Sequence, residues 1–108
     1  MARTRVLVAH HDLDTLSKIY LTLVHRNYKA EACNKSEELA ERIKRMKPAV
    51  VILCFGSYQV IKSKLKTPAI VLVEKHEIDS VETDPEIIAL EKPLQMDVLM
   101  HNVQKLVV

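Results

Sequence analysis

Side chains that could bind a metal ion or act as nucleophiles follow several apolar runs of this 108-residue chain. His10-His11-Asp12 follows the first run, Cys54 closes a central one, and Lys92 follows the last. Thiolate and imidazole are ligands that suit zinc or copper, and a thiol near an ammonium group is a candidate for redox chemistry. Which of these chemistries applies depends on the elements that position the side chains.

The apolar runs are typical of strands that are buried on both faces. The central run lies between Pro48 and Gly56, the single glycine of the chain, and has five apolar residues without alternation. Segments with helical spacing separate the runs, which predicts a parallel α/β sheet covered on both faces, with function at the carboxyl ends of its strands. We expect strands at residues 5–9, 29–33, 50–54, 69–73 and 87–90.

Between the strands, the spacing of apolar residues predicts three regular helices and two shortened crossovers. We expect helices from Asp12 or Asp14 to Arg26, from an N-cap at Ser36 to Pro48, and from 96 to 107. The crossover 55–68 has room for two or three turns, which we expect Ser57 to cap. The acidic segment 74–86 has few apolar residues and predicts a short or irregular helix.

Composition excludes several classes of function. Hydrophobic residues make up 48% and charged residues 28% of the chain, and the formal net charge is +2. This charge and the scarcity of aromatic residues argue against a nucleic-acid partner, and no apolar run is long enough to span a membrane. We expect a cytoplasmic protein without a cofactor, with one domain over residues 1–108 that could be part of a larger protein.

Laid out this way, the chain resembles the receiver domain of bacterial response regulators over essentially its whole length. The segments that carry the resemblance are Val6 to Asp12, Pro48 to Cys54, Pro68 to Val73, and Glu91-Lys92-Pro93 followed by a closing helix. The resemblance implies a flavodoxin-like (βα)5 three-layer sandwich with a five-stranded parallel sheet of order 2-1-3-4-5, here with shortened third and fourth crossovers. It also implies that the Lys92-Pro93 bond is often cis in such proteins.

The same resemblance identifies a phosphoacceptor pocket whose chemistry is missing here. The acidic pair of the family falls on His10 and His11, the phosphoacceptor aspartate on Cys54, and the hydroxyl residue on Val73, so that Lys92 alone is retained. Magnesium requires oxygen ligands, and phosphoryl transfer requires a nucleophilic carboxylate with a metal to neutralise charge. The sequence therefore predicts a degenerate, non-enzymatic pseudo-receiver that acts by protein–protein interaction in two-component signal transduction, independently of phosphorylation.

A candidate partner surface lies on the short third crossover. We expect Tyr58, Lys62, Lys64 and Lys66 to face a protein partner, which would be a signalling domain, an output domain or a second copy of the chain. The acidic segment 74–86 should follow on the same side of the sheet. One alternative is that this charged surface is merely solvated. Another is that the partner contacts the last strand and the last helix, as the resemblance to receiver dimers suggests.

A second interpretation of the strand ends is a metal- or redox-responsive sensor that uses Cys33, His10, His11 and Cys54. With strand order 2-1-3-4-5, the two cysteines lie two strand spacings apart, roughly 9 to 10 Å. A disulfide needs a Cα separation below about 7 Å, so both should be reduced thiols. Buried cysteines and adjacent histidines more often serve packing than metal binding.

Overall fold

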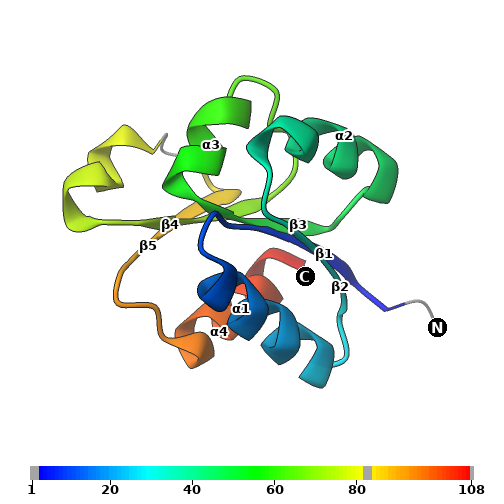
Figure 1. Ribbon diagram of the computed structural model, residues 1–108. Helices are drawn as coiled ribbons and strands as arrows, with labels where there is room; N and C mark the ends of the chain where they lie inside the picture. The colour runs from blue at the N-terminus through cyan, green and yellow to red at the C-terminus, as the bar shows by residue number, and fades with distance from the viewer. Residues whose placement is uncertain (1–2, 82–83, 108) are drawn as a thin grey trace.

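The structure is a computed structural model that describes residues 3–81 and 84–107. Its elements alternate between strand and helix along the chain (Figure 1). They are β1 (Arg5–Ala9), α1 (Leu13–His25), β2 (Lys29–Cys33), α2 (Ser36–Met46), β3 (Val50–Cys54), α3 (Phe55–Ile61), β4 (Ala69–Val73), the 3-10 helix η1 (Lys75–Ser80), β5 (Ile87–Glu91) and α4 (Met96–Val107).

The five strands form one parallel sheet of order β2-β1-β3-β4-β5. Helices α1 and α4 cover one face, while α2, α3 and η1 lie on the other, so the molecule is a three-layer sandwich (Figure 1). This confirms the predicted sheet order and flavodoxin-like architecture. The third and fourth crossovers are short, as expected, because α3 has 7 residues and η1 has 6.

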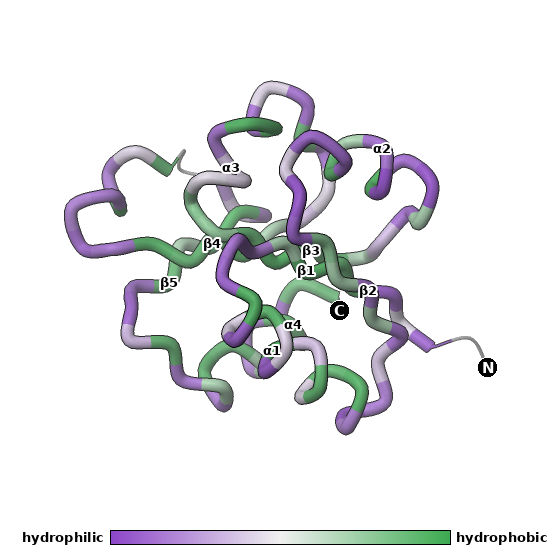
Figure 2. The backbone as a smooth tube through the Cα atoms, viewed as in Figure 1, coloured by the Kyte–Doolittle hydropathy of each residue, from purple (hydrophilic) through white to green (hydrophobic). Residues whose placement is uncertain are grey.

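The two faces of the sheet pack into separate hydrophobic clusters. All five residues of β3 and of β4 are buried, which is why their sequences show no polar alternation. The apolar strands run through the centre of the molecule, with the hydrophilic segments outside them (Figure 2). Leu16, Ile19 and Leu23 of α1 pack on one face, while Leu39 of α2 packs on the other.

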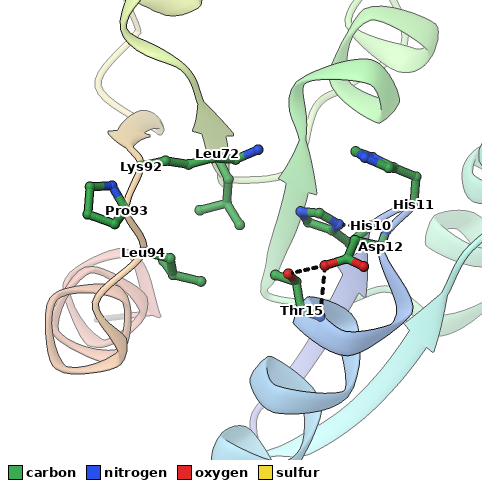
Figure 3. Close-up of a pocket in the computed structure, with 8 residues that line it drawn as sticks. All are labelled: His10, His11, Asp12, Thr15, Leu72, Lys92, Pro93 and Leu94. Carbon is green, nitrogen blue, oxygen red and sulfur yellow. Dashed lines mark hydrogen bonds between the residues drawn. The ribbon is translucent and has the colours of Figure 1, made fainter.

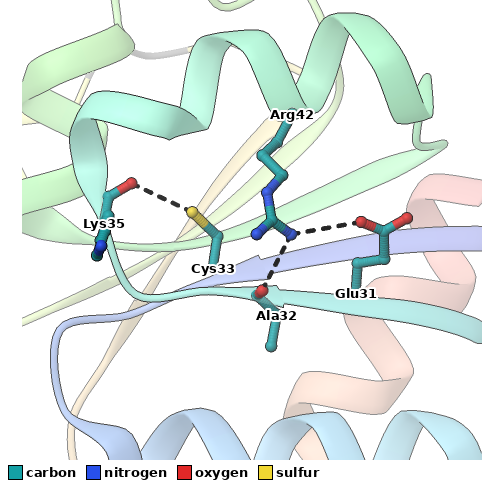
Figure 4. A network of polar contacts seen from close by, with 5 residues as sticks. All are labelled: Glu31, Ala32, Cys33, Lys35 and Arg42. Atoms are coloured by element: carbon teal, nitrogen blue, oxygen red, sulfur yellow. Dashed lines mark hydrogen bonds and ion pairs between the residues drawn. The ribbon is translucent and has the colours of Figure 1, made fainter.

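The edge strand β2 is partly exposed and is tied to α2 by a polar network (Figure 4). The Arg42 guanidinium of α2 donates hydrogen bonds to Glu31 Oε1 at 3.5 Å and to the Ala32 carbonyl at 3.4 Å. At the end of the same strand, the Cys33 thiol donates to the Lys35 carbonyl at 3.2 Å. Cys33 is a free, buried thiol whose proton is engaged by the backbone.

The start of α3 differs from the prediction. The helix begins at Phe55 rather than at Ser57, so Ser57 lies inside its first turn and does not cap it. Tyr58 is 1% exposed and belongs to the core, so its predicted place on a partner surface is wrong. Ser36 likewise begins α2 without capping it through its side chain. In the described part of the chain, no helix has the length and apolar character needed to cross a membrane.

Candidate functional site

A cavity of about 520 Å³ opens at the carboxyl ends of β1, β4 and β5. Figure 3 shows the side chains of its lining, which come from the β1–α1 loop and the first turn of α1 on one side, and from β4 and the β5–α4 loop on the other. The lining residues are His10, His11, Asp12, Thr15, Leu72, Lys92, Pro93 and Leu94.

Strand register brings these loops together. Ala9 of β1 pairs with Leu53 of β3, and Cys54 of β3 pairs with Leu72 of β4, so the three strands end at nearly the same level. The sheet ends at β5, where the Lys92 N–H donates to the Val73 carbonyl at 2.9 Å. The Lys92-Pro93 bond is cis, as the resemblance implied.

Asp12 on the cavity rim is engaged as the N-cap of α1. Its Oδ2 accepts hydrogen bonds from the Thr15 N–H at 3.3 Å and from the Thr15 hydroxyl at 2.5 Å. The hydroxyl bond is the main reason that the pKa of Asp12 lies below its usual value of 3.8. Asp12 is therefore a charged, solvent-exposed carboxylate that stabilises the first turn of the helix.

His10 is the most deeply buried polar group of the cavity, with 3% of its surface exposed. Its Nδ1 accepts a hydrogen bond from the Asp12 N–H at 3.0 Å, and its ring stacks on that of His11 at a centroid distance of 4.9 Å. Burial, then the charges of His11 and Lys92, lower the pKa of His10 against the opposing effect of Asp12. His10 is therefore neutral at pH 7.

The second nitrogen of His10, Nε2, is buried and finds no hydrogen-bond partner among the residues that the structure describes. A buried polar group left unsatisfied costs about 1–3 kcal/mol. Such groups are rare in folded proteins and are usual places for a water molecule, an ion or a ligand.

Lys92 faces His10 from the opposite side of the cavity and is half-exposed. Its side chain extends across the end of β4 toward the histidines (Figure 3). Its ammonium lies 3.3 Å from Glu74 Oε1, and the side chains of the two residues are 40% and 50% exposed. An ion pair this exposed contributes at most about 1 kcal/mol, so a ligand could displace Glu74 from Lys92 at little cost.

Cys54 lies behind this cavity rather than on it. Its Sγ is 3.2 Å from Ser57 Oγ, which is 3.3 Å from Ser36 Oγ, so a thiol and two hydroxyls form a chain between α2 and α3. Burial raises the pKa of the Cys54 thiol, but hydrogen bonds with Ser57 and His11 outweigh it and bring the pKa below its usual 9.0. The sequence pointed to Cys54 but assigned both serines only a helix-capping role, although Ser57 lies one helical turn after Cys54.

Of the predicted pocket residues, the structure brings His10, His11 and Lys92 together on one cavity. Cys54 and Val73 do not line it, and Val73 is fully buried in the cluster on the opposite face of the sheet. Leu72 fills the place expected for Val73 in the lining.

The proposed metal donors do not form a site. Within residues 3–81 and 84–107, no three His, Cys, Asp or Glu side chains are close enough to hold a metal ion. Cys33 also directs its thiol to the Lys35 carbonyl. The predicted metal set of Cys33, His10, His11 and Cys54 is therefore not supported by the geometry. The strand ends supply hydrogen-bond donors and a thiol instead.

Comparison with known proteins gives a consistent fold. Neither a protein-family model nor a curated protein sequence matches the chain. Among solved structures, it is similar to a response regulator receiver domain from Bermanella marisrubri, with a TM-score of 0.82 and 20% identity over 98% of this chain and 99% of that one. It is also similar to the receiver domain of the Francisella response regulator 1452, with a TM-score of 0.79 and 19% identity over 97% of each chain.

A third similar structure is the chemotaxis protein CheY4 of Vibrio cholerae, with a TM-score of 0.77 and 18% identity over 97% of this chain and 99% of that one. All three comparisons cover nearly the whole of both chains at low identity. The chain therefore has the fold of response regulator receiver domains, with two histidines and a buried thiol at the strand ends where the resemblance leads one to expect carboxylates.

Proposed function

We propose that this chain is a pseudo-receiver, a receiver-fold domain that binds a protein partner without being phosphorylated. The observation that carries the proposal is the buried thiol of Cys54 at the end of β3, the position that the resemblance assigns to the phosphoacceptor aspartate. The similar solved structures are described as response regulators and a chemotaxis protein of bacteria, which supports a role in bacterial signal transduction.

The surroundings of Cys54 support the same conclusion. Phosphoryl transfer needs a metal ion to neutralise the transferred oxygens, and magnesium prefers carboxylate ligands. Of the described residues that line the cavity, Asp12 is the one carboxylate, and Thr15 already holds its Oδ2. A single engaged carboxylate beside two imidazoles is a poor magnesium site.

The test is a titration of the protein with magnesium and beryllofluoride, which mimics a phosphoryl group on a carboxylate. We expect the amide NMR spectrum to stay unchanged, because no carboxylate occupies the acceptor position. Shifts clustered around Cys54 and Lys92 would show that a substitute acceptor operates and would refute the proposal.

We place the partner surface on the α2–α3 side of the molecule. Lys62, Lys64 and Lys66 are exposed after the end of α3, and a groove of about 850 Å³ lies between α2 and α3. Ile43 and Ile61 line the groove, and it is bordered by basic residues together with Glu41. An apolar groove with a mainly basic border fits a partner segment with apolar and acidic residues.

Charge reversal with a matched control tests this surface. The triple change Lys62→Glu, Lys64→Glu and Lys66→Glu should abolish capture of the partner from a lysate of the cells that make the protein. The control reverses Lys18, Lys29 and Lys105, which are also exposed but lie away from the groove, and it alters net charge equally. If both triple variants capture the same proteins as the wild type, measured by quantitative mass spectrometry, this surface is excluded.

A redox-responsive thiol is the second candidate function. Hydrogen bonds with Ser57 and His11 lower the pKa of Cys54, and a larger thiolate fraction favours oxidation. Cys54 is 3% exposed, which limits access of oxidants. Peroxide treatment followed by a sulfenic-acid probe tests it, and an unmodified Cys54 would remove this candidate.

A further inference from the structure

The buried ring of His10 has its tautomer fixed by the backbone. Nδ1 accepts the Asp12 N–H at 3.0 Å, so the lone pair of Nδ1 is used and this nitrogen carries no proton. In the neutral ring the one remaining proton must then lie on Nε2. His10 therefore presents an N–H donor at Nε2, and this donor has no acceptor among residues 3–81 and 84–107.

This tautomer determines what the cavity can bind. A metal ion would need the lone pair of Nε2, which the proton occupies, so binding through Nε2 would require the Asp12 N–H bond to break. An oxygen acceptor needs no such rearrangement. In the receiver family, the resemblance implies an acidic pocket that binds a cation at these strand ends. In this chain, His10 places a hydrogen-bond donor there, which suits an anion instead.

Two further groups shape the ligand. The Lys92 ammonium reaches into the same cavity (Figure 3). Among the described residues, its ion-pair partner is the half-exposed Glu74. The Asp12 carboxylate on the rim repels an anion, but it is solvent-exposed and bonded to Thr15, so water screens much of its charge. The donor of His10 and the cation of Lys92 face each other across the cavity, and the carboxylate on its rim is screened, which favours weak binding of an anion.

We propose that the cavity between the β1–α1 and β5–α4 loops is a binding site for a small oxyanion, a carboxylate or a phosphate, held by His10 Nε2–H and the Lys92 ammonium. The cavity volume of about 520 Å³ leaves room for a small molecule that carries the anionic group. Binding is non-covalent and needs neither a metal ion nor a nucleophile. The site is independent of the partner surface on the α2–α3 side.

The experiment combines a tautomer measurement with an NMR titration of the wild-type protein. A long-range 1H–15N spectrum of the histidine rings should show His10 protonated at Nε2 and not at Nδ1. Titration with sodium phosphate, and separately with sodium acetate, at ionic strength held constant with chloride, should give saturable shifts at His10 and Lys92 with millimolar dissociation constants. Tighter binding of phosphate or of acetate identifies the class of oxyanion.

The decisive variant is His10→Asn. Its amide oxygen can occupy the place of Nδ1 and keep the Asp12 N–H bond, but no atom occupies the place of Nε2, so affinity should fall by about tenfold or more. His101→Asn makes the same substitution at an exposed histidine of α4 and should bind as the wild type does. Lys92→Met should also weaken binding and decides the matter if His10→Asn does not fold.

Three results would overturn the proposal. They are an Nδ1–H tautomer of His10, an affinity in the folded His10→Asn or Lys92→Met variant equal to that of the wild type, and the absence of saturable shifts with either anion. The beryllofluoride experiment has a separate outcome when the shifts at Cys54 are compared with and without magnesium, because an anion held by His10 and Lys92 alone needs no magnesium. Loss of this proposal would therefore leave the proposed pseudo-receiver role unaffected.

Discussion

The polar groups at the ends of β3 and β1 lie on neighbouring strands but differ in how their hydrogen bonds are satisfied. At the end of β3, Cys54, Ser57 and Ser36 bond to one another at 3.2 and 3.3 Å within packed protein. After β1, His10 is equally buried, yet the structure gives its Nε2 no partner in the described ranges. We call the group at the end of β3 the closed group, because its side chains have hydrogen-bond partners within the protein. We call His10 the open group, because its Nε2 has none among the described residues.

The comparison teaches that reactive residue type and binding capacity are separate properties. The thiol of Cys54 at the end of β3 draws attention first, but it lies behind the cavity and its hydrogen-bond partners come from the protein itself. The histidine is chemically milder, yet it lines the cavity and has an unused donor. We therefore assign packing and thiol chemistry to Cys54 and ligand binding to His10.

The largest expected effect comes from placing a charge in the closed group. Cys54→Asp puts a carboxylate at a position that is 3% exposed, among groups that already bond to one another. Since an uncompensated buried charge is strongly destabilising, we expect the free energy of unfolding to fall by about 3 kcal/mol. Urea denaturation at pH 7, followed by circular dichroism, measures the loss.

Cys54→Ser is the matched control for this change. Its hydroxyl is neutral, similar in size and able to bond to Ser57, so we expect a loss of about 1 kcal/mol or less. If the aspartate variant is as stable as the serine variant, the end of β3 is open to water and the contrast between the two groups is wrong.

The second effect concerns the pH dependence of the open group. Burial, His11 and Lys92 lower the pKa of His10 in the folded state below its usual 6.5, with Asp12 opposing. The unfolded chain therefore binds a proton at a higher pH than the native state does. Stability contributed by the neutral ring is present above pH 6.5 and is lost as the pH falls through 6.5 toward the lower folded pKa.

We measure this contribution as a difference between two proteins. The free energy of unfolding of the wild type, minus that of His10→Asn, should be constant above pH 7 and should decrease between pH 7 and pH 5. Subtraction removes the pH-dependent contributions of groups that do not interact with His10. A difference that rises on acidification would mean that His10 is protonated in the folded state, which would contradict its assignment as a neutral donor.

The fold could be predicted because each element depends on a local pattern of residues. Unbroken apolar runs predicted β3 and β4, the strand β2 was expected at 29–33, and the helix 96–107 was predicted with its observed bounds. The short helix α3 was predicted with the wrong start. About two turns of helix carry too little periodicity to fix the inward face, so Tyr58 was expected outside and is buried.

The candidate site could be predicted only at the level of strand ends. Parallel strands end at one edge of the sheet, which is why His10, His11 and Lys92 meet. Side chains alternate between faces along a strand, so a shift of one residue exchanges Val73 for Leu72 in the cavity lining. The direction of the hydrogen bond at Nδ1 determines the tautomer of His10. It depends on three-dimensional geometry and cannot be predicted from the sequence.

The smallest effect tests which way the hydroxyl of Ser57 donates. If Ser57 donates to Cys54 Sγ, it stabilises the thiolate, and Ser57→Ala should raise the pKa of Cys54, because burial is then opposed only by the His11 bonds and the backbone N–H of residue 57. The rate of alkylation by iodoacetamide against pH, measured in a Cys33→Ser background, reports this pKa, and Ser36→Ala should move it less. If Ser57→Ala leaves the midpoint unchanged, Ser57 donates instead to Ser36 and accepts the thiol proton of Cys54. Cys54 would then be an unreactive thiol, and the redox function would be excluded. Ligand binding by His10 would remain as the function proposed for this edge of the sheet.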